Sequence, residues 1–287
     1  MDRTENDKRP VLMLVTSMLI FGTIGLIRRY IPLPSALIAF IRGIIGGLFI
    51  LPFALRRKGD RISRRGMILL VTAGILIGFN WVLLFEAYNY TTVAVATLCY
   101  YMQPTIVTLL SPAVLGEKLT IRKVLCAAVA VAGMVLVSGV TDSSGAGGGD
   151  IRGILFGLGA AVLYSADILI NKSVAEGDVY RRTATELLSA GLVLIPYLAL
   201  TDGFRTEGTG PAAVILLIVA GIIHTGVAYL LYFGSLNRLS AQSAAILSYI
   251  DPVSALLFSA LFLREPLSPA GIIGAVMIIG SALISEL

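Results

Sequence analysis

The chain has 287 residues, of which 57% are hydrophobic and only 14% are charged, and its mean hydropathy is +0.90. A soluble fold of this length could not cover so much apolar side chain, and the same composition excludes a disordered chain. The net charge of +5 would favour a nucleic-acid-binding protein only if the basic residues gathered on a soluble surface, so the sequence predicts a polytopic membrane protein instead.

Ten segments are long and apolar enough to cross a bilayer as helices, which takes about 20 residues each. In chain order they are residues 10–27, 34–55, 66–88, 91–116, 120–140, 151–171, 184–200, 211–234, 241–264 and 269–284. Glycines, prolines and polar residues separate them, and the alternating pattern of membrane-spanning strands is absent. We therefore expect an all-α bundle of ten transmembrane helices with no soluble domain.

The basic residues predict the orientation of these helices. With the N-terminus in the cytoplasm, 16 of the 22 Lys and Arg residues fall in cytoplasmic connections and five in external ones, while Arg42 alone lies within a segment. Cytoplasmic connections of membrane proteins carry this excess of positive charge. The sequence thus predicts a multi-pass protein of the cytoplasmic (inner) membrane with both termini in the cytoplasm.

The chain also contains an internal repeat. A shift of 148 residues aligns Gly78–Thr120 with Gly226–Ser268 without gaps, with 12 of the 43 positions identical. Each copy holds five helices, an odd number, so the second copy enters the membrane in the opposite orientation. We expect two inverted five-helix repeats, residues 1–140 and 151–287, joined by a Gly/Ser-rich linker at 141–150. Inverted repeats place a substrate site near the midplane of the membrane, at their interface.

Several motifs carry a resemblance to a known family. The fourth segment of each half closes on similar sequences, LGEKLT at 115–120 and LREPLS at 263–268, and each half has a Tyr-x-x-Pro motif. Together with Arg42 and the turn at 235–240, this pattern resembles the EamA-type family of the drug/metabolite transporter superfamily. The resemblance implies a ten-helix exporter of amino acids, other metabolites or drugs.

Two repeat-related prolines, Pro104 and Pro252, lie near the centres of the fourth and ninth segments. Each removes a backbone donor and should free the carbonyl four residues earlier, at Tyr100 and Ser248. Packing kinks are common in membrane helices. Because these two prolines are related by the repeat, we interpret them as hinges in the wall of a substrate cavity.

Beside the prolines lie Gln103 and its counterpart Asp251. A charged group at the bilayer centre costs a few kcal/mol, so it usually faces a polar cavity or a partner. Asp251 either binds a substrate amino group or a proton, or it caps the backbone or pairs with Arg42 or His224. His224, the only histidine, either relays protons or packs as a neutral residue.

Other intramembrane charges suggest ion pairs or coupling groups. Arg42 is expected to act as a structural anchor or to contact a carboxylate, and Glu86 could neutralise it. Asp167 is expected to form an ion pair or gate with Lys172. We also expect Glu186 to pair with a neighbouring arginine, either Arg181 or Arg182.

Polar and aromatic residues at central depths complete the predicted substrate site. They are Asn80, Trp81, Tyr100, Tyr101, Tyr164, Tyr229 and Tyr249. Their alternative role is packing or contact with lipid. Aromatic rings with a few polar groups suit a small amphipathic substrate or an organic cation.

These residues favour a secondary transporter that moves an amino acid or related compound outward by alternating access. The alternatives are a multidrug or organic-cation exporter, a facilitative uniporter and an intramembrane enzyme. An enzyme is disfavoured because the sequence holds one histidine and no hydrolase motif. We expect no cofactor and no metal. The expected partners are a small-molecule substrate, the lipid bilayer and protons as a coupling ion, without nucleic acid, for a monomer or, alternatively, a dimer.

Overall fold

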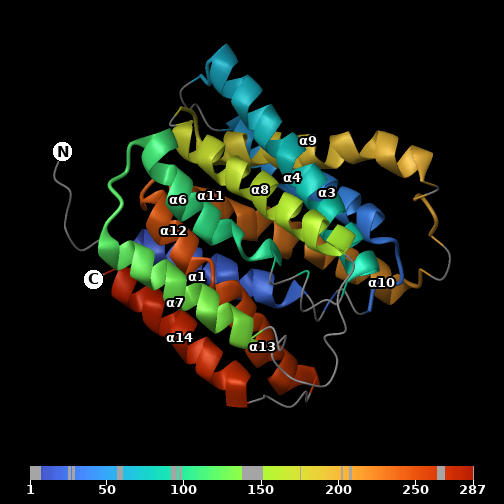
Figure 1. Cartoon of the computed structure of the whole chain (residues 1–287). Coiled ribbons are helices and arrows are strands. Elements are labelled where there is room, and N and C mark those ends of the chain that lie inside the picture. Colours follow the sequence, from blue (N-terminus) through green and yellow to red (C-terminus); the bar gives the residue numbers. More distant parts are fainter. Residues whose placement is uncertain are drawn as a thin grey trace.

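The computed structural model describes residues 8–24, 27, 30–56, 61–91, 96, 99–137, 151–174, 176–201, 203–206, 209–263 and 269–286. Regular structure within these residues is helical throughout (Figure 1). The first part of the chain forms α1 (Arg9–Gly22), α3 (Ser35–Arg56), α4 (Arg64–Tyr90), α6 (Gln103–Leu115) and α7 (Ile121–Val137). The second part forms α8 (Ile151–Ser173), α9 (Val179–Leu200), α10 (Pro211–Gly221), the π-helix η1 (Ile222–Val227), α11 (Ala228–Leu236), α12 (Ala241–Leu247), α13 (Ile250–Leu263) and α14 (Pro269–Glu286). The linker predicted at 141–150 and the motif residues 264–268 lie outside the described residues.

Each predicted apolar segment overlaps at least one of these helices, and local signals explain many of their ends. The Ser63 hydroxyl accepts a hydrogen bond from the Gly66 N–H, at 3.0 Å, and so caps α4. Pro104 and Pro211 lie in the first turns of α6 and α10, where a missing backbone donor costs nothing. α6 ends at Gly116, whose φ of 68° is a left-handed conformation that glycine adopts without strain.

The start of α9 differs from the prediction. The sequence places the seventh segment at 184, with the preceding charged residues in a connection, whereas α9 begins at Val179. Asp178 fixes this start, because its side chain accepts a hydrogen bond from the Tyr180 N–H at 2.9 Å. Arg182 is therefore a helical residue with only 1% of its surface exposed.

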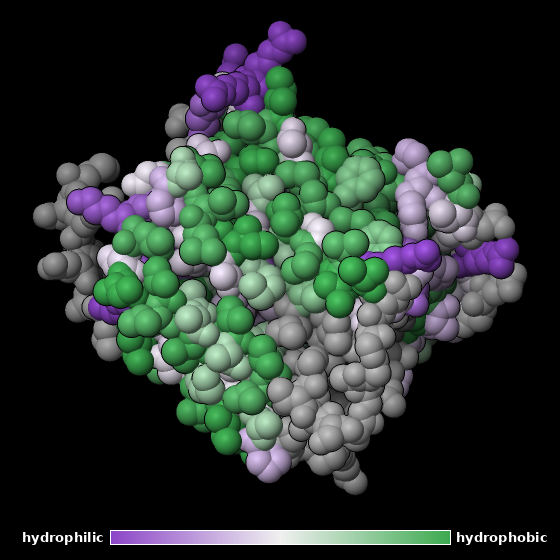
Figure 2. Space-filling view, viewed as in Figure 1, coloured by the Kyte–Doolittle hydropathy of each residue, from purple (hydrophilic) through white to green (hydrophobic). Residues whose placement is uncertain are grey.

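The outside of the bundle is apolar. Five helical stretches are long and apolar enough to span a membrane: Ser35–Arg56, Arg64–Leu84, Ile151–Ser173, Val179–Leu200 and Pro211–Leu236. Large aliphatic side chains face outward, and Leu55, Ile121, Leu200 and Leu261 are each more than 70% exposed. Figure 2 shows such side chains covering much of one face, with hydrophilic groups near its margins. Since only lipid can cover so much apolar surface, the protein is an all-α polytopic membrane protein.

The fourth and ninth segments are interrupted at the predicted depth. α6 begins after a turn at Tyr101, and Ser248 and Tyr249 separate α12 from α13. The prolines thus lie in the first turn of a new helix. The helix is therefore interrupted at the positions where a kink was expected. The sequence suggested that the Ser248 carbonyl would be free. Instead, this carbonyl accepts a hydrogen bond from the Asp251 N–H at 3.2 Å.

Helices related by the repeat pack against each other in opposite directions. Gly43 of α3 meets Gly191 of α9, which follows it by the repeat distance of 148 residues. Four residues further along α3, Gly47 meets Leu188, which precedes Gly191 on α9. α3 and α9 are therefore antiparallel and cross at equivalent residues, as two inverted repeats require around a two-fold axis.

The remaining contacts follow the same symmetry. α4 packs on α8 as the repeat-related α11 packs on α1, and α6 packs on α8 as α13 packs on α1. α7 and α14, the last helices of the two halves, also pack together and lie side by side in Figure 1. The molecule is thus built as two inverted five-helix repeats whose broken helices, α6 and α12–α13, meet at the centre.

Candidate functional site

Seven aromatic side chains from both repeats form a continuous series inside the bundle, which we call the aromatic row. Adjacent rings have centroids 5.0–6.4 Å apart, within the range of favourable aromatic contact. In order, the row is Tyr101, Tyr100, Tyr164, Tyr232, Phe21, Tyr229 and Trp81. These residues come from α1, α4, α8, α11 and the residues just before α6, so five separate parts of the chain build one surface.

One end of the row meets a carboxyl group. The Tyr101 hydroxyl donates a hydrogen bond to Oδ2 of Asp251 at 2.9 Å. Asp251 lies in the first turn of α13, where the partial positive charge of a helix N-terminus stabilises a carboxylate. Its described hydrogen-bond partner is thus Tyr101, whereas the sequence offered Arg42 or His224.

The other end of the row meets a guanidinium group. Cζ of Arg42 lies 5.4 Å from the centroid of the Trp81 ring, which is the geometry of a cation–π contact. Nε of Arg42 donates to the Thr225 hydroxyl at 3.0 Å. The Tyr229 and Tyr100 phenols also lie close enough to interact with it electrostatically. A buried cation therefore lies against the Trp81 end of the row.

The π-helix η1 places two polar residues beside α1 and α3. One is Thr225, the partner of Arg42. The other is His224, which is 4% exposed and whose Nε2 shares a hydrogen bond of 2.8 Å with the Thr23 hydroxyl. Single π turns within α-helices are frequent at functional sites. His224 thus joins η1 to α1, and its role as a proton relay stays a prediction.

Three other predicted residues lie in packed interfaces. Asn80 is 1% exposed and donates to the Ala160 carbonyl at 2.7 Å, which ties α4 to α8. Gln103 is 3% exposed, and its backbone carbonyl accepts from Ser165 at 3.2 Å. Tyr249 is fully buried in a second cluster beside α7 and α14, against which Tyr101 of the aromatic row packs.

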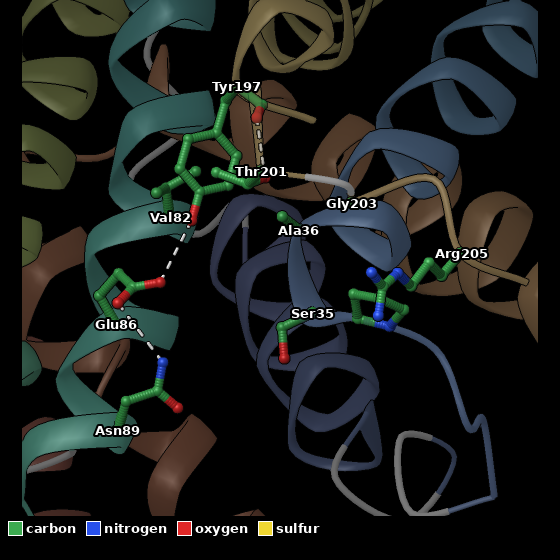
Figure 3. Close-up of a pocket in the computed structure, with 10 residues that line it drawn as sticks. Ser35, Ala36, Val82, Glu86, Asn89, Tyr197, Thr201, Gly203 and Arg205 are labelled. Atoms are coloured by element: carbon green, nitrogen blue, oxygen red, sulfur yellow. Dashed lines mark hydrogen bonds between the residues drawn. The ribbon is translucent and has the colours of Figure 1, made fainter. Parts of the chain in front are cut away.

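A cavity of about 630 Å³ opens between the start of α3 and the ends of α4 and α9 (Figure 3). This is the end that the charge count predicts to be external. Glu86 lies in its wall and accepts hydrogen bonds from the Tyr197 hydroxyl at 3.2 Å and from Asn89 at 3.4 Å. The contact with Arg42 that the sequence suggested is thus replaced by these two. Val82, also in the wall, directly follows Trp81 of the row.

Asp167 is held differently from the prediction. Nδ2 of Asn171, one turn later on α8, donates to Oδ1 of Asp167 at 3.1 Å and also to Oε1 of Glu186 on α9. Lys172, the predicted partner, instead donates to the carbonyls of Leu236 and Leu239. The ammonium group of Lys172 therefore binds carbonyls at the end of α11 and not the buried Asp167 carboxyl.

The sequence reasoning missed Phe21, Tyr232, Thr225 and Asn171. Tyr232 follows Tyr229 by three residues and Asn171 follows Asp167 by four, so helical spacing alone would place each beside a residue that was chosen. Phe21 and Thr225 carry no such signal. Among the described residues, no three His, Cys, Asp or Glu side chains gather where they could hold a metal ion.

Comparison with known proteins agrees with this architecture. The sequence model of the EamA-like transporter family matches residues 8–139 and 151–286, so both repeats are covered. An uncharacterized transporter of Bacillus subtilis, YxxF, is 31% identical over 88% of this chain and 81% of its own length. Protein PecM of Dickeya dadantii is 26% identical over 90% of this chain and 85% of its own.

A solved crystal structure shares the fold, with a TM-score of 0.85 and 23% identity over 97% of this chain and 98% of that one. The family model, the relatives and the fold therefore agree over essentially the whole chain. With its two repeats, its lipid-facing surface and a polar site inside the bundle, this chain belongs to the EamA-like transporter family and is a multi-pass membrane transporter.

Proposed function

We propose that this protein is a secondary transporter that moves an amino acid or a related small amphipathic metabolite out of the cell by alternating access. The observation that carries the proposal is the aromatic row, with the Asp251 carboxyl at one end and the Arg42 guanidinium near the other. A substrate with an ammonium group, a carboxylate and an apolar side chain matches all three chemistries.

The moving parts in this proposal are the two repeats, 1–140 and 151–287, joined by the linker at 141–150. Pro104 and Pro252 lie where the central helices break, so α6 and α13 could tilt about these points without losing hydrogen bonds within a helix. The charge count supports an orientation in the cytoplasmic membrane with both termini inside. Rocking of the repeats would expose the row to each side in turn.

The test is counterflow of labelled phenylalanine into liposomes that contain the purified protein and are preloaded with unlabelled phenylalanine. Wild-type protein should show saturable counterflow, and Asp251→Asn should reduce it about 10- to 100-fold, since a hydrogen bond to a charged group contributes about 1.5–3 kcal/mol. Glu176→Gln, an exposed carboxyl in the α8–α9 connection, is the matched control. Unchanged counterflow in Asp251→Asn, or chemical conversion of phenylalanine, would overturn the proposal.

A second candidate is an exporter of organic cations, which the row and Asp251 would also accommodate. The two candidates differ in their need for Arg42. Phenethylamine is phenylalanine without its carboxylate, so it gives the discriminating measurement. Counterflow of phenethylamine that is as strong as that of phenylalanine, and insensitive to Arg42→Gln, would favour the organic-cation exporter.

A further inference from the structure

Four polar side chains are buried where α8 and α9, which both pack on α4, are joined by hydrogen bonds. Asp167 and Asn171 come from α8, and Arg182 and Glu186 come from α9. Arg182 is 1% exposed and the other three are fully buried. We call this group the α8–α9 cluster. Charged side chains at such depth are rare unless they are paired or functional.

The contacts hold the two carboxyl groups beside each other. One amide nitrogen, Nδ2 of Asn171, donates to both Asp167 and Glu186, and the two carboxyl groups are also close enough to share a hydrogen bond directly. Arg182 donates from Nη2 to the Asn171 carbonyl at 2.5 Å and interacts electrostatically with Glu186. The cluster is therefore one connected unit.

The charges of this unit do not balance without a proton. Two carboxylates would carry two negative charges, whereas Arg182 supplies one positive charge. Two adjacent carboxylates in a low-dielectric site cannot both ionise without a large cost, so such pairs share a proton. One shared proton makes the cluster neutral and supplies the hydrogen-bond donor that a carboxyl–carboxyl contact needs.

Among the residues that the structure describes, Arg182 is the cation found to act on this pair of carboxyl groups. The titratable groups that act on Asp167 from α8 and α11 are the phenols of Tyr164, Tyr229 and Tyr232, which are neutral near pH 7. From α9, Arg182 acts on Glu186. Lys172, the next basic residue on α8, has its ammonium group engaged by the Leu236 and Leu239 carbonyls.

The cluster also keeps unused hydrogen-bonding atoms. Among the described residues, five of its buried atoms have no partner: Oδ2 of Asp167, Oε2 of Glu186, Oδ1 of Asn171, and Nε and Nη1 of Arg182. Buried polar atoms without partners are costly and are few in a purely structural network. Unused acceptors on both carboxyls give a proton alternative positions, and the neighbouring guanidinium disfavours a metal cation.

The position of the cluster connects it to the substrate site. Tyr164 of the aromatic row precedes Asp167 by three residues, which is less than one turn of α8. α8 packs on α4 and α6 of the first repeat, and α9 packs on α3 and α4. A change in how the repeats pack would therefore alter the surroundings of both carboxyls.

We propose that Asp167 and Glu186 share one proton and form the site through which transport is coupled to proton movement. The proton binds a carboxylate oxygen from one side of the membrane and leaves the same pair toward the other side, and no other bond changes. This inference rests on the proposed function, because coupling requires transport, but the existence of the proton site can be tested alone.

The first test is infrared spectroscopy of the purified protein near pH 7, which detects the carbonyl stretch of a protonated carboxyl group in an apolar site. Wild-type protein should show this band, and both Glu186→Gln and Asp167→Asn should lose or shift it. Two variants on different helices guard against the failure of one to fold. Glu176→Gln, which removes an exposed carboxyl, should leave the band unchanged. A wild-type spectrum without the band, or a band unchanged in both variants, would overturn the inference.

The second test measures accumulation of labelled phenylalanine in liposomes under an imposed pH gradient, with the membrane potential set to zero. One proton exchanged for each neutral substrate supports an about tenfold concentration ratio per pH unit, because one pH unit equals about 1.4 kcal/mol. Glu186→Gln should lose this gradient-driven accumulation.

The outcomes of the second test are distinct. Counterflow without any response to the pH gradient in wild-type protein, or a response to a sodium gradient instead, would overturn the coupling role. Absence of counterflow in wild-type protein would contradict the proposed function, and the infrared measurement would still decide whether the shared proton exists.

Discussion

Identical residues at repeat-related positions make different contacts in this molecule. Tyr101 and Tyr249 are equivalent by the repeat, and each bonds the opposite repeat through its hydroxyl. Tyr101 donates to Asp251, whereas Tyr249 shares a hydrogen bond of 3.0 Å with Thr105. The difference arises because Asp251 is matched in the other repeat by the neutral Gln103. The symmetric scaffold therefore carries an asymmetric site.

This asymmetry predicts different effects of the same substitution. Tyr101→Phe removes the hydroxyl that orients Asp251, so phenylalanine counterflow should weaken by about 10- to 100-fold in apparent affinity. Tyr249→Phe removes a hydrogen bond between two neutral hydroxyl groups and should change affinity far less. The measurement is the concentration dependence of counterflow for both variants. Equal effects would show that the Asp251 contact has no special role.

A second residue-scale prediction concerns Glu176, which lies outside the membrane-spanning helices. Its carboxylate accepts a hydrogen bond from the Ser63 N–H at 2.7 Å, and this bond holds the pKa of Glu176 below its ordinary value of 4.5. A lowered pKa in the folded state means that the contact stabilises the fold at pH values above the ordinary pKa of this carboxyl group. That contribution is lost as the pH falls through the lowered pKa.

The thermal unfolding midpoint, measured between pH 6 and pH 3, tests this contact. Wild-type protein should lose slightly more stability over this interval than Glu176→Gln, in which no carboxyl titrates at that position. The effect should be small because the group is exposed to solvent. Parallel curves for the two proteins would show that the contact does not contribute.

At the scale of whole helices, the crossing of α3 and α9 gives a prediction about packing. A methyl group on Gly43 would lie 3.0 Å from the Gly191 nitrogen and 3.1 Å from the Leu187 carbonyl oxygen, which are backbone atoms. A methyl group on Gly191 would first meet the end of the Ile44 side chain, at 2.8 Å, which can rotate away. Gly43→Ala should therefore destabilise the protein by about 1–3 kcal/mol, and Gly191→Ala by less.

The measurement is the free energy of unfolding in mixed detergent micelles. Gly280→Ala on α14 is the control, since no atom lies within 4 Å of the added methyl group. Alanine there should be neutral or stabilising by up to about 1 kcal/mol, because glycine is a poor helix former. A Gly43→Ala protein as stable as Gly280→Ala would contradict the close crossing at the two-fold axis.

The helices that the sequence predicted best are those whose signal is local. Apolar runs and breakers place the membrane segments, whereas the repeat-related prolines were expected as hinges near helix centres and lie instead where α6 and α13 begin. The first turns of α9 were assigned to a connection because they carry charged residues, although Arg182 among them is buried. The π-helix η1 was also missed, since a single wider turn leaves no periodic pattern in the sequence. Both exceptions depend on contacts with distant helices.

The site shows the same division between local and distant signals. Charges and aromatics at central depth were found because their residue types are unusual in a membrane segment. Most of their hydrogen-bond partners were not, because Tyr101 for Asp251 and Thr225 for Arg42 come from other helices and Asn171 lies one turn from Asp167. Arg182 does interact with Glu186, as expected. Composition identifies which groups need a partner, but only the packing of α8, α9 and η1 decides which one they receive.

At the scale of the whole molecule, the two ends of the bundle differ. At the end predicted to be cytoplasmic, Glu117 after α6 accepts hydrogen bonds from the backbone N–H groups of Ala241, at 2.7 Å, and Gln242, at 3.4 Å. The Gln242 side chain donates to Ser111 at 2.9 Å. Lys123 donates to the Ser240 hydroxyl at 3.0 Å. These bonds join the two repeats, while the opposite end holds the cavity beside Glu86.

The contacts of Glu117 should therefore keep the cytoplasmic end closed, and removing them should open it. Ser111 is fully buried beneath these bonds, so Ser111→Cys in a background with Cys99→Ala and Cys126→Ala reports opening through its reaction with a membrane-impermeant thiol reagent. Glu117→Ala removes a charged acceptor worth about 1.5–3 kcal/mol and should raise the labelling rate about tenfold or more, with Glu117→Gln intermediate. Thr120→Ala is the control, because the described hydrogen bond of the Thr120 side chain comes from the backbone N–H of Lys123 in its own turn. Labelling in Glu117→Ala no faster than in Thr120→Ala would show that other contacts close this end, whereas faster labelling would identify Glu117 as the residue that holds the repeats together there.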